Sequence, residues 1–440
     1  MQNEKTAGIV SLGCAKNRVD TENLLGVLGK CGYRIVSNPQ DATLLIVNTC
    51  GFIEPAKQES IDAVLEMAQY KETGRCKKLL VVGCLAQRYA EELSEGIPEA
   101  DGFMGVADYA RLRECLAEME RGKRPIYTEY GARFLPCDRV LTTPPYSAYV
   151  KISDGCNNRC SYCAIPLIRG KYVSRDYGDI LAECRRLAKA GVRELTLIAQ
   201  DTSRYGNDFP ERTLLLPKML KEVSAIEGVT WTRVLYCYPD TVTDELLDTI
   251  AETEGVCKYM DLPLQHISAA LLRKMHRRGS PELIRSLLQK CRDRGILVRT
   301  TFIVGFPGET EAMFSELCDF VKEARFDRMG AFTYSPEEGT PACDMPNQIG
   351  EEEKQRRLDL LMTLQQGISL EKNEQRIGKT YIVLTEGFED GRYVGRSDLE
   401  APEVDGNILF TSDAPVKAGE FVRVKITGCD AYDLYGEAIL

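Results

Sequence analysis

Histidine is nearly absent from this chain of 440 residues, which contains only His266 and His276. So little histidine argues against a histidine-rich zinc site and against a Ser-His-Asp hydrolase, because both kinds of site need imidazole groups. We therefore expect the function to rest on other side chains.

Long hydrophobic runs are also lacking. The longest are four or five residues, such as LLIV at 44–47 and LLVV at 79–82, whereas a membrane-spanning helix needs about 20. The first residues, MQNEKTAGIVSLGC, are polar and charged before they become apolar, so we expect no signal peptide. The net charge of −10 argues weakly against a protein built mainly to bind phosphate backbones. These features predict a cytoplasmic protein that does not contact a membrane.

Cysteine, by contrast, is abundant, with 17 residues. An odd number in a chain without an export signal does not suggest a disulfide framework. It suggests either thiolate metal chemistry or cysteine used as a small core residue.

Residues 1–135 are predicted to form an open α/β sheet domain. Continuous apolar runs of the kind found in buried parallel strands lie at 8–14, 44–50 and 79–84. They are separated by helical patterns, the clearest of which follows Pro55 and places Ile61, Val64, Leu65 and Ala68 on one face. The spacing between the runs is that of β-α-β units.

A proline-bearing linker is predicted over 136–148, followed by an α/β core over 149–370. Six strands alternating with helices favour a partial or complete TIM-like barrel. The candidate strands lie at 149–153, 194–201, 233–239, 259–265, 298–306 and 329–335. An amphipathic helix with Leu358, Leu361, Leu364 and Ile368 aligned follows them.

The final segment, 371–440, is predicted to be a small antiparallel β-barrel of five strands. Its β-rich runs are short and are separated by Gly, Asp and Pro. From Ile377 onward it contains six Lys or Arg against twelve Asp or Glu, a net charge of −6. An acidic barrel favours a basic protein partner over RNA, although acidic residues also commonly do no more than solvate an exposed barrel.

The strongest motif is GCNNRCSYC, which spaces Cys156, Cys160 and Cys163 as C-x3-C-x2-C just after a strand. Three thiolates from one loop suit three irons of a 4Fe–4S cube and leave the fourth iron open. Zinc is the alternative metal, but structural zinc needs a fourth ligand, and no second cysteine pair or histidine lies nearby. Three unrelated buried cysteines are the remaining alternative.

A second set of cysteines follows from topology. Cys14, Cys50 and Cys84 each lie at the carboxyl end of a predicted parallel strand, where open α/β sheets bind their ligands. Each one alone is better explained as a buried core thiol, but the three together, at equivalent strand ends, suggest the ligands of a second cluster.

The first motif, with Tyr162 before its last cysteine, resembles that of the radical S-adenosylmethionine (SAM) enzymes. The resemblance implies that the open iron binds SAM and that one electron cleaves it to a 5′-deoxyadenosyl radical. IVGFPGET at 303–310 resembles the glycine-containing strand that lines the nucleoside in this family, with Gly305 and Glu309 at the matching positions. LPLQH at 262–266 is a second candidate wall. A tight β-α turn would explain the glycine equally well.

Nearly the whole chain resembles the methylthiotransferases, which combine an α/β domain, a radical SAM core and a TRAM barrel. The resemblance implies two 4Fe–4S clusters, one on Cys156, Cys160 and Cys163 and an auxiliary one on Cys14, Cys50 and Cys84 that supplies or relays sulfur. SAM would serve as both radical source and methyl donor. No catalytic residue beyond the cluster ligands is identified.

The segments SLGCAKNRVDTE, YVKISDGCNNRCSYCAIPLIRGKYVSR and GRSDLEAPEVDG resemble the RimO-type branch. This implies methylthiolation of the β-carbon of an aspartate in the ribosomal small-subunit protein uS12, either free or in the subunit, with an unidentified reductant. One alternative is a tRNA adenosine methylthiotransferase; another is an iron–sulfur carrier or electron-transfer protein, which should not cleave SAM.

Overall fold

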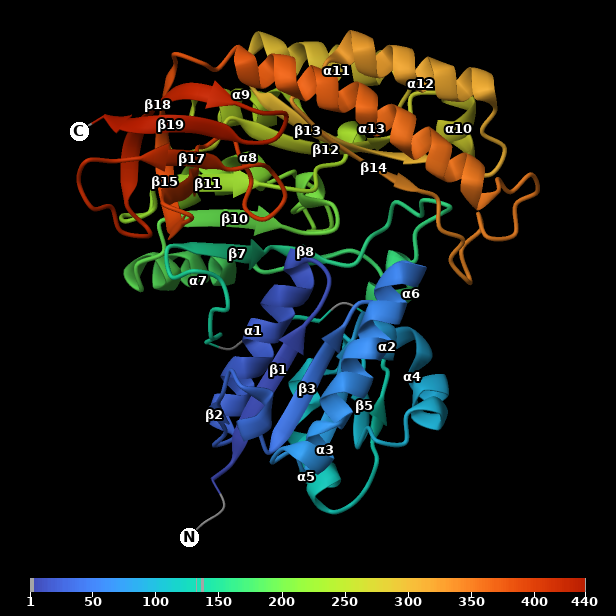
Figure 1. Ribbon diagram of the computed structural model, residues 1–440. Helices are drawn as coiled ribbons and strands as arrows, with labels where there is room; N and C mark the ends of the chain where they lie inside the picture. Colours follow the sequence, from blue (N-terminus) through green and yellow to red (C-terminus); the bar gives the residue numbers. More distant parts are fainter. Residues whose placement is uncertain (1–3, 132, 136–137, 440) are drawn as a thin grey trace. The chain divides into compact units, whose positions relative to one another are not determined.

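A computed structural model describes residues 4–131, 133–135 and 138–439, which fold into two compact units (Figure 1). Residues 1–3 and 132 of the predicted first domain, 136 and 137 of the predicted linker and 440 of the predicted barrel lie outside the described residues. The first unit comprises residues up to 142 together with 151–175 and 335–343, and the second comprises 143–150, 176–334 and 344 onward.

The first unit is built on a six-stranded sheet in the order β2-β1-β3-β4-β5-β6. Every neighbouring pair in this sheet is parallel, which confirms the predicted open α/β sheet. The strands are β1 (Thr6–Ser11), β2 (Arg34–Ile35), β3 (Leu44–Thr49), β4 (Lys78–Gly83), β5 (Gly102–Met104) and β6 (Ile126–Tyr127). The predicted apolar runs are the buried strands β1, β3 and β4.

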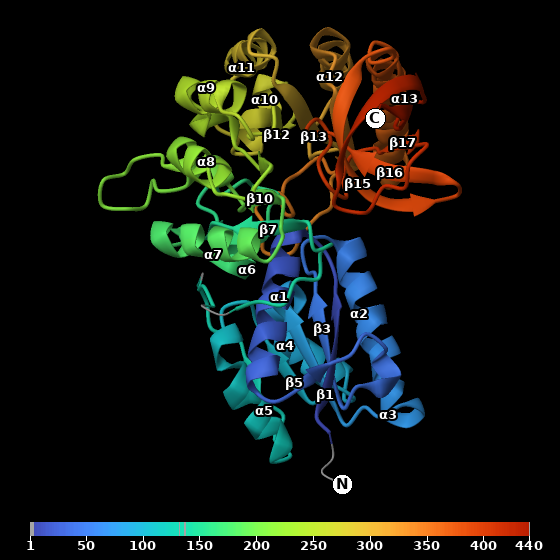
Figure 2. The ribbon, with the colours of Figure 1, turned by 90° about the vertical axis from the view of Figure 1, so that its left-hand side faces the viewer.

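Helices cover both faces of this sheet (Figure 2). Residues of α1 (Ala15–Lys30) and α5 (Leu112–Glu120) pack in one apolar core, and those of α2 (Glu54–Ala68) and α4 (Cys84–Gly96) pack in the other. The short α3 (Tyr70–Thr73) follows α2. Helix α2 begins beside Pro55 as predicted, but Leu65 is exposed and Met67 is buried. The buried face is therefore turned away from Leu65.

The cysteine loop of the predicted core belongs to this first unit. Strands β8 (Ser153–Asp154) and β9 (Val173–Ser174) pair antiparallel and close the chain around the loop and α6 (Ile165–Arg169). Ala164 and Ile168 pack into the same apolar core as α1 and α5. Both cysteine sets thus lie in one compact unit.

The second unit contains strands at the six places predicted for the core, except that Lys151, the last residue of the first of them, belongs to the first unit. They form two three-stranded sheets, β11-β10-β7 and β12-β13-β14, and the pairs β10–β11, β12–β13 and β13–β14 are parallel. The N–H of Cys237, after β11, donates to Asp261 of β12, so the two sheets follow each other as in a partial barrel. The strands are β7 (Ser147–Lys151), β10 (Glu194–Ile198), β11 (Trp231–Val234), β12 (Tyr259–Gln265), β13 (Leu297–Val304) and β14 (Arg328–Thr333).

Seven helices of this unit alternate with or follow the strands (Figure 1). They are α7 (Tyr177–Lys189), α8 (Leu216–Ser224), α9 (Asp244–Glu252), α10 (Ala269–Lys274), α11 (Pro281–Asp293), α12 (Glu311–Ala324) and α13 (Glu351–Glu374). Helix α13 is the predicted amphipathic helix, and its Leu361 and Ile368 are buried. No helix in the described part of the chain is long and apolar enough to cross a membrane.

The carboxyl-terminal strands close into the predicted five-stranded barrel, in the order β15-β16-β17-β19-β18. All pairs are antiparallel except β17–β19, which is parallel. The strands are β15 (Thr380–Glu389), β16 (Arg392–Arg396), β17 (Ile408–Thr411), β18 (Phe421–Cys429) and β19 (Leu434–Ile439).

A buried ionic joint connects this barrel to the core strands of the same unit. Glu194 of β10 accepts from Arg396 of β16 at 3.0 Å and from Arg233 of β11 at 3.2 Å, and all three residues are buried. Burial raises the pKa of Glu194, but the two guanidinium groups outweigh this effect and hold the pKa at about 2. The carboxylate is therefore charged wherever the protein is folded at ordinary pH.

The low pKa of Glu194 predicts that the free energy of unfolding falls as the pH is lowered. The Glu194→Gln substitution should remove this dependence on pH. Because the pKa is lower in the folded than in the unfolded chain, Glu194 contributes stability above its ordinary pKa of 4.5, and the contribution is lost as the pH falls toward 2. We expect the loss to be about 3 kcal/mol. Urea unfolding of both proteins from pH 7 to pH 3 should capture about 2 kcal/mol of this loss, because the loss is complete only below the folded pKa.

At pH 7 the Glu194→Gln protein should itself be less stable by about 3–5 kcal/mol, because two buried arginines lose the carboxylate that they share. Glu227→Gln, at an exposed position, is the matched control and should behave as the unaltered protein. Parallel pH profiles for the Glu194→Gln protein and the unaltered protein would contradict the role of the joint.

Candidate iron–sulfur and SAM sites

Parallel pairing brings the predicted auxiliary cysteines to one edge of the first unit's sheet. Thr49, the last residue of β3, is in register with Gly83, the last residue of β4, so Cys50 and Cys84 leave neighbouring strands together. Cys14 lies three residues beyond β1, which pairs with the other side of β3, and it caps the start of α1. The edge therefore carries all three cysteines, as the topology predicted.

Glycines let the three cysteine-bearing turns approach one another. A Cβ atom on Gly13, whose φ is +83°, would lie 3.0 Å from the Sγ of Cys50. A Cβ atom on Gly51 would lie 2.8 Å from the backbone nitrogen of Leu85, next to Cys84. Larger residues at either position would force the turns apart.

The thiols of this edge differ in acidity. Desolvation raises the pKa of Cys14, but the charges of Lys16 and Arg169 and the N–H groups at the start of α1 outweigh it, and the net pKa is lowered. Burial, with the neighbouring Cys84 as the next cause, raises the pKa of Cys50 to about 12, and burial raises that of Cys84. A positive ion would be needed to hold the last two as thiolates.

The predicted radical-cluster ligands Cys156, Cys160 and Cys163 lie in one loop between β8 and α6. The N–H of Cys163 donates to the carbonyl of Cys160 at 3.1 Å, and the N–H of Cys156 donates to the carbonyl of Gly170 at 3.1 Å. Cys160 is buried, whereas Cys156 and Cys163 are half-buried. Tyr162, the aromatic residue of the motif, is half-buried beside them.

The donor sets suit thiolate-bound iron–sulfur clusters. The sheet edge and the loop each supply three sulfurs. A cation, Arg169, lies near Cys84 at the sheet edge. In a cube each of these thiolates binds a different iron. Among the described residues, no group of three or more His, Cys, Asp or Glu side chains is arranged to hold a metal ion.

Sequence reasoning missed a buried charge network beside both sets. Arg169, the last residue of α6, binds Asp154 of β8 at 3.0 Å and Asp20 of α1 at 2.9 Å. Lys151 binds Asp154 at 2.8 Å and also binds Asp20. All four side chains are buried. The only signal in the sequence is a charged residue at the end of the short apolar stretch AIPLIRG.

A second missed feature is the segment 335–343, which packs in the same unit. Glu337 is buried and binds Arg88 at 3.1 Å and Lys57 at 3.3 Å. The N–H of Ala342 donates to the carbonyl of Ser161, between Cys160 and Cys163, at 2.8 Å. The segment thus supports the cysteine loop from a distant part of the chain.

The predicted SAM residues Gly305 and Glu309 lie in the second unit, at the end of β13. The carboxylate of Glu309 is buried and accepts from the N–H of Gly305 and, at 2.8 Å, from Arg357 of α13. Its other oxygen lies 3.0 Å from Nε2 of His266. Nδ1 of that imidazole accepts from the N–H of Ser268 at 2.9 Å, so a neutral ring carries its proton on Nε2 and donates to Glu309.

These contacts join the two candidate nucleoside walls, 262–266 and 303–310, through paired strands β12 and β13. Glu309 therefore holds the turn at Gly305 in place through protein contacts. Its contact with SAM, like that of Tyr162 and Gly305, stays a prediction.

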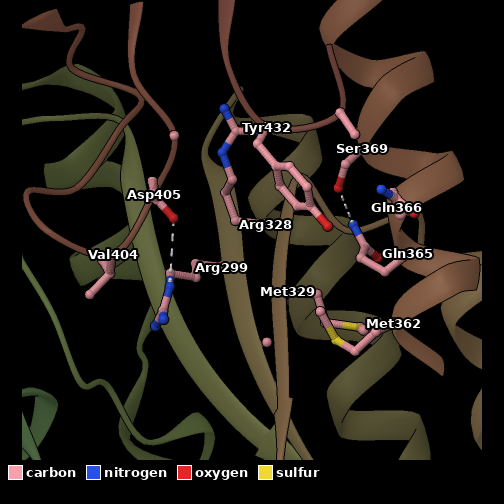
Figure 3. Close-up of a pocket in the computed structure, with 13 residues that line it drawn as sticks. Arg299, Arg328, Met329, Met362, Gln365, Gln366, Ser369, Val404, Asp405 and Tyr432 are labelled. Carbon is pink, nitrogen blue, oxygen red and sulfur yellow. Dashed lines mark hydrogen bonds and ion pairs between the residues drawn. The ribbon is translucent and has the colours of Figure 1, made fainter. Parts of the chain in front are cut away.

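Figure 3 shows a pocket of the second unit, between β13, β14, α13 and loops of the barrel. Arg299 of β13 forms an ion pair across it with Asp405 at 3.7 Å, and Gln365 donates to Ser369 at 3.0 Å. None of the predicted site residues lines this pocket. It lies where the core strands and α13 pack against the barrel loops.

Gly305 predicts a steric test of this turn. Its φ is +74°, and a Cβ atom there would lie 2.3 Å from the Cγ of the buried Lys354. We expect Gly305→Ala to lower the free energy of unfolding by about 1–3 kcal/mol. Gly367→Ala is the control, because that helical glycine of α13 has open space around it and should gain up to about 1 kcal/mol. Equal thermal stability of the two variants would contradict the crowding.

Three family profiles match the chain. That of the radical SAM superfamily matches residues 150–321, that of the uncharacterized protein family UPF0004 matches 6–105, and that of the TRAM domain matches 377–439. Among solved structures, the radical SAM methyltransferase TsrM from Kitasatospora setae has a TM-score of 0.57 at 15% identity, over 77% of this chain and 75% of TsrM. The cobalamin-dependent SAM radical enzyme OxsB has a TM-score of 0.51 at 14% identity, over 83% of this chain and 56% of OxsB. These two structures support the fold.

Close relatives are found among curated proteins. The ribosomal protein uS12 methylthiotransferase RimO of Desulforamulus reducens is 50% identical over 98% of this chain and 98% of its own length. The protein of the same name from Clostridium acetobutylicum is 48% identical over 98% of this chain and 97% of its own length. The chain is therefore a radical SAM methylthiotransferase, with SAM and two 4Fe–4S clusters as its cofactors, and it belongs to the RimO family of ribosomal protein uS12 methylthiotransferases.

Proposed function

We propose that this chain transfers a methylthio group to the β-carbon of an aspartate in ribosomal protein uS12. The observation that supports this most strongly is the presence of both cysteine sets in one compact unit of a chain with full-length RimO relatives. Those relatives are named for a protein substrate, which disfavours the tRNA adenosine and electron-carrier alternatives.

Within this proposal Cys156, Cys160 and Cys163 hold the radical-generating cluster, and Cys14, Cys50 and Cys84 hold the auxiliary cluster. When bound, the clusters and SAM supply the hydrogen-abstracting radical, the sulfur and the methyl group. The segment 335–343 stabilises the loop that carries Cys156, Cys160 and Cys163 through the hydrogen bond from the N–H of Ala342 to the carbonyl of Ser161. Glu309 keeps Gly305 in the conformation that we expect the nucleoside to need.

The proposed domains are the auxiliary-cluster domain over 1–135, the radical core over 149–370 and the TRAM barrel over 371–440, with the linker 136–148 between the first two. The substrate is uS12, free or in the small subunit, and an external reductant supplies the electron. A ribosomal substrate makes the cytoplasm the proposed location, and nucleic acid contact is not the main determinant of recognition.

Single cysteine substitutions separate the two proposed clusters. Cys160→Ala should abolish both SAM cleavage and methylthiolation, because the radical cluster loses a ligand. Cys50→Ala should retain SAM cleavage but lose sulfur insertion. Chromatography of 5′-deoxyadenosine and mass spectrometry of uS12 measure the two activities in anaerobically reconstituted protein.

Cys31→Ala is the matched control, since Cys31 follows α1 at the end opposite Cys14. It should keep both activities. If Cys50→Ala methylthiolates uS12 at the normal rate, the auxiliary ligand assignment is wrong.

A substrate competition tests the choice of target. The reconstituted protein, with SAM, reductant and sulfide, is offered uS12 and unmodified tRNA together. We expect a mass gain of one methylthio group on an aspartate of uS12 and none on tRNA. A gain on tRNA adenosine instead would overturn the proposed substrate while retaining the radical chemistry.

A further inference from the structure

Among the described residues of the buried charge network, Arg169 contacts both the strand before the radical-cluster loop and the sulfur of a predicted auxiliary ligand. One of its nitrogens, Nη1, donates to Asp154, two residues before Cys156. The other, Nη2, pairs with Asp20 and donates to the Sγ of Cys84 at 3.7 Å. A single planar guanidinium therefore spans the base of the radical-cluster loop and a predicted auxiliary ligand.

Asn17 extends this contact to the other auxiliary turns. Its Oδ1 accepts from Nη2 of Arg169 at 3.5 Å. Its Nδ2 donates to the carbonyl of Leu12 at 2.8 Å, close to Cys14, and lies 3.3 Å from the carbonyl of Thr49, next to Cys50. The position of Arg169 is thus tied to all three turns of the sheet edge.

Stability alone does not account for this network. Burying two cations and two carboxylates carries a desolvation cost that well-packed apolar residues would avoid. Arginine is suited to the place because its fork donates in several fixed directions at once, which lysine cannot do. A charged fork placed beside a sulfur at this cost points to a role at that sulfur.

A cation at a ligating sulfur acts on the cluster's reduction potential. Reduction adds negative charge to the cluster, and a nearby positive charge or N–H donor stabilises the reduced form, which raises the potential. Asp20, 2.9 Å from Nη2 of Arg169, offsets part of that positive charge. The two residues should therefore act in opposite directions.

We propose that Arg169 is a positioning residue that fixes the radical-cluster loop to the auxiliary edge and raises the reduction potential of the auxiliary cluster through Cys84, with Asp20 as its counterweight. This inference rests on the proposed assignment of Cys84 as a ligand.

The test is an EPR-monitored redox titration of the full chain, reconstituted anaerobically in a Cys160→Ala background so that the auxiliary cluster is the one titrated. Arg169→Gln should shift the potential to a more negative value. Asp20→Asn, which is isosteric, should shift it to a more positive value. Arg139→Gln removes another buried arginine of the unit, the partner of Glu22, and should leave the potential unchanged.

Shifts of opposite sign are the signature that a purely structural role would not produce. An unchanged potential in folded, cluster-loaded Arg169→Gln, or an unchanged or more negative potential in Asp20→Asn, would overturn the proposal. If Arg169→Gln does not fold, Asp20→Asn decides alone. Iron content of Cys84→Ala reports separately on the ligand assignment: a retained auxiliary cluster would refute that assignment, whereas its loss together with an unchanged Arg169→Gln potential would refute the role of Arg169 alone.

Discussion

Parallel strand register is the constraint on which the auxiliary site depends. Thr49 and Gly83 are paired at the ends of adjacent strands, so the residues that follow them, Cys50 and Cys84, must emerge side by side. A shift of one residue would place a different residue at one of these positions and reverse the faces of a buried strand. The apolar cores on both faces of the sheet resist such a shift. Apolar packing far from the cysteines therefore fixes the positions at which they leave the strands.

The charged network has the opposite energetic character from that sheet. Its groups are buried without apolar gain, and both cations are held by a carboxylate from a distant segment, Asp20 of α1. Such a network specifies one arrangement of the loop, because any displacement leaves a buried charge unpaired. The sheet thus supplies stability, and the network supplies position.

The sequence was sufficient to predict what depends on local pattern. Buried parallel strands, the six core strands and the five-stranded barrel all follow from short apolar runs and their spacing, and cysteines at strand ends could be grouped by topology. Contacts such as those of Arg169, Glu337 and Glu309 could not be predicted, because a charged side chain carries no periodic signal that names its partner. Leu65 shows the same limit at finer scale: helical spacing placed it on the packed face, but which stripe is buried is decided by the sheet beneath the helix.

The barrel illustrates why a charge count is a poor guide to a surface. Several of the acidic residues behind its net charge of −6 point inward to the core of the same unit. Glu400 is buried and binds Arg328 of β14 at 3.2 Å, and Asp405 pairs with Arg299 of β13. Glu400 also binds Arg376, and Glu386 accepts from Arg396 at 2.8 Å, within the segment 371–440 itself. Carboxylates neutralised in this way contribute little to the field that a partner meets. The acidity of the barrel is in part the means by which it is attached to the core, so the choice of a protein substrate over RNA rests on the family and not on this charge.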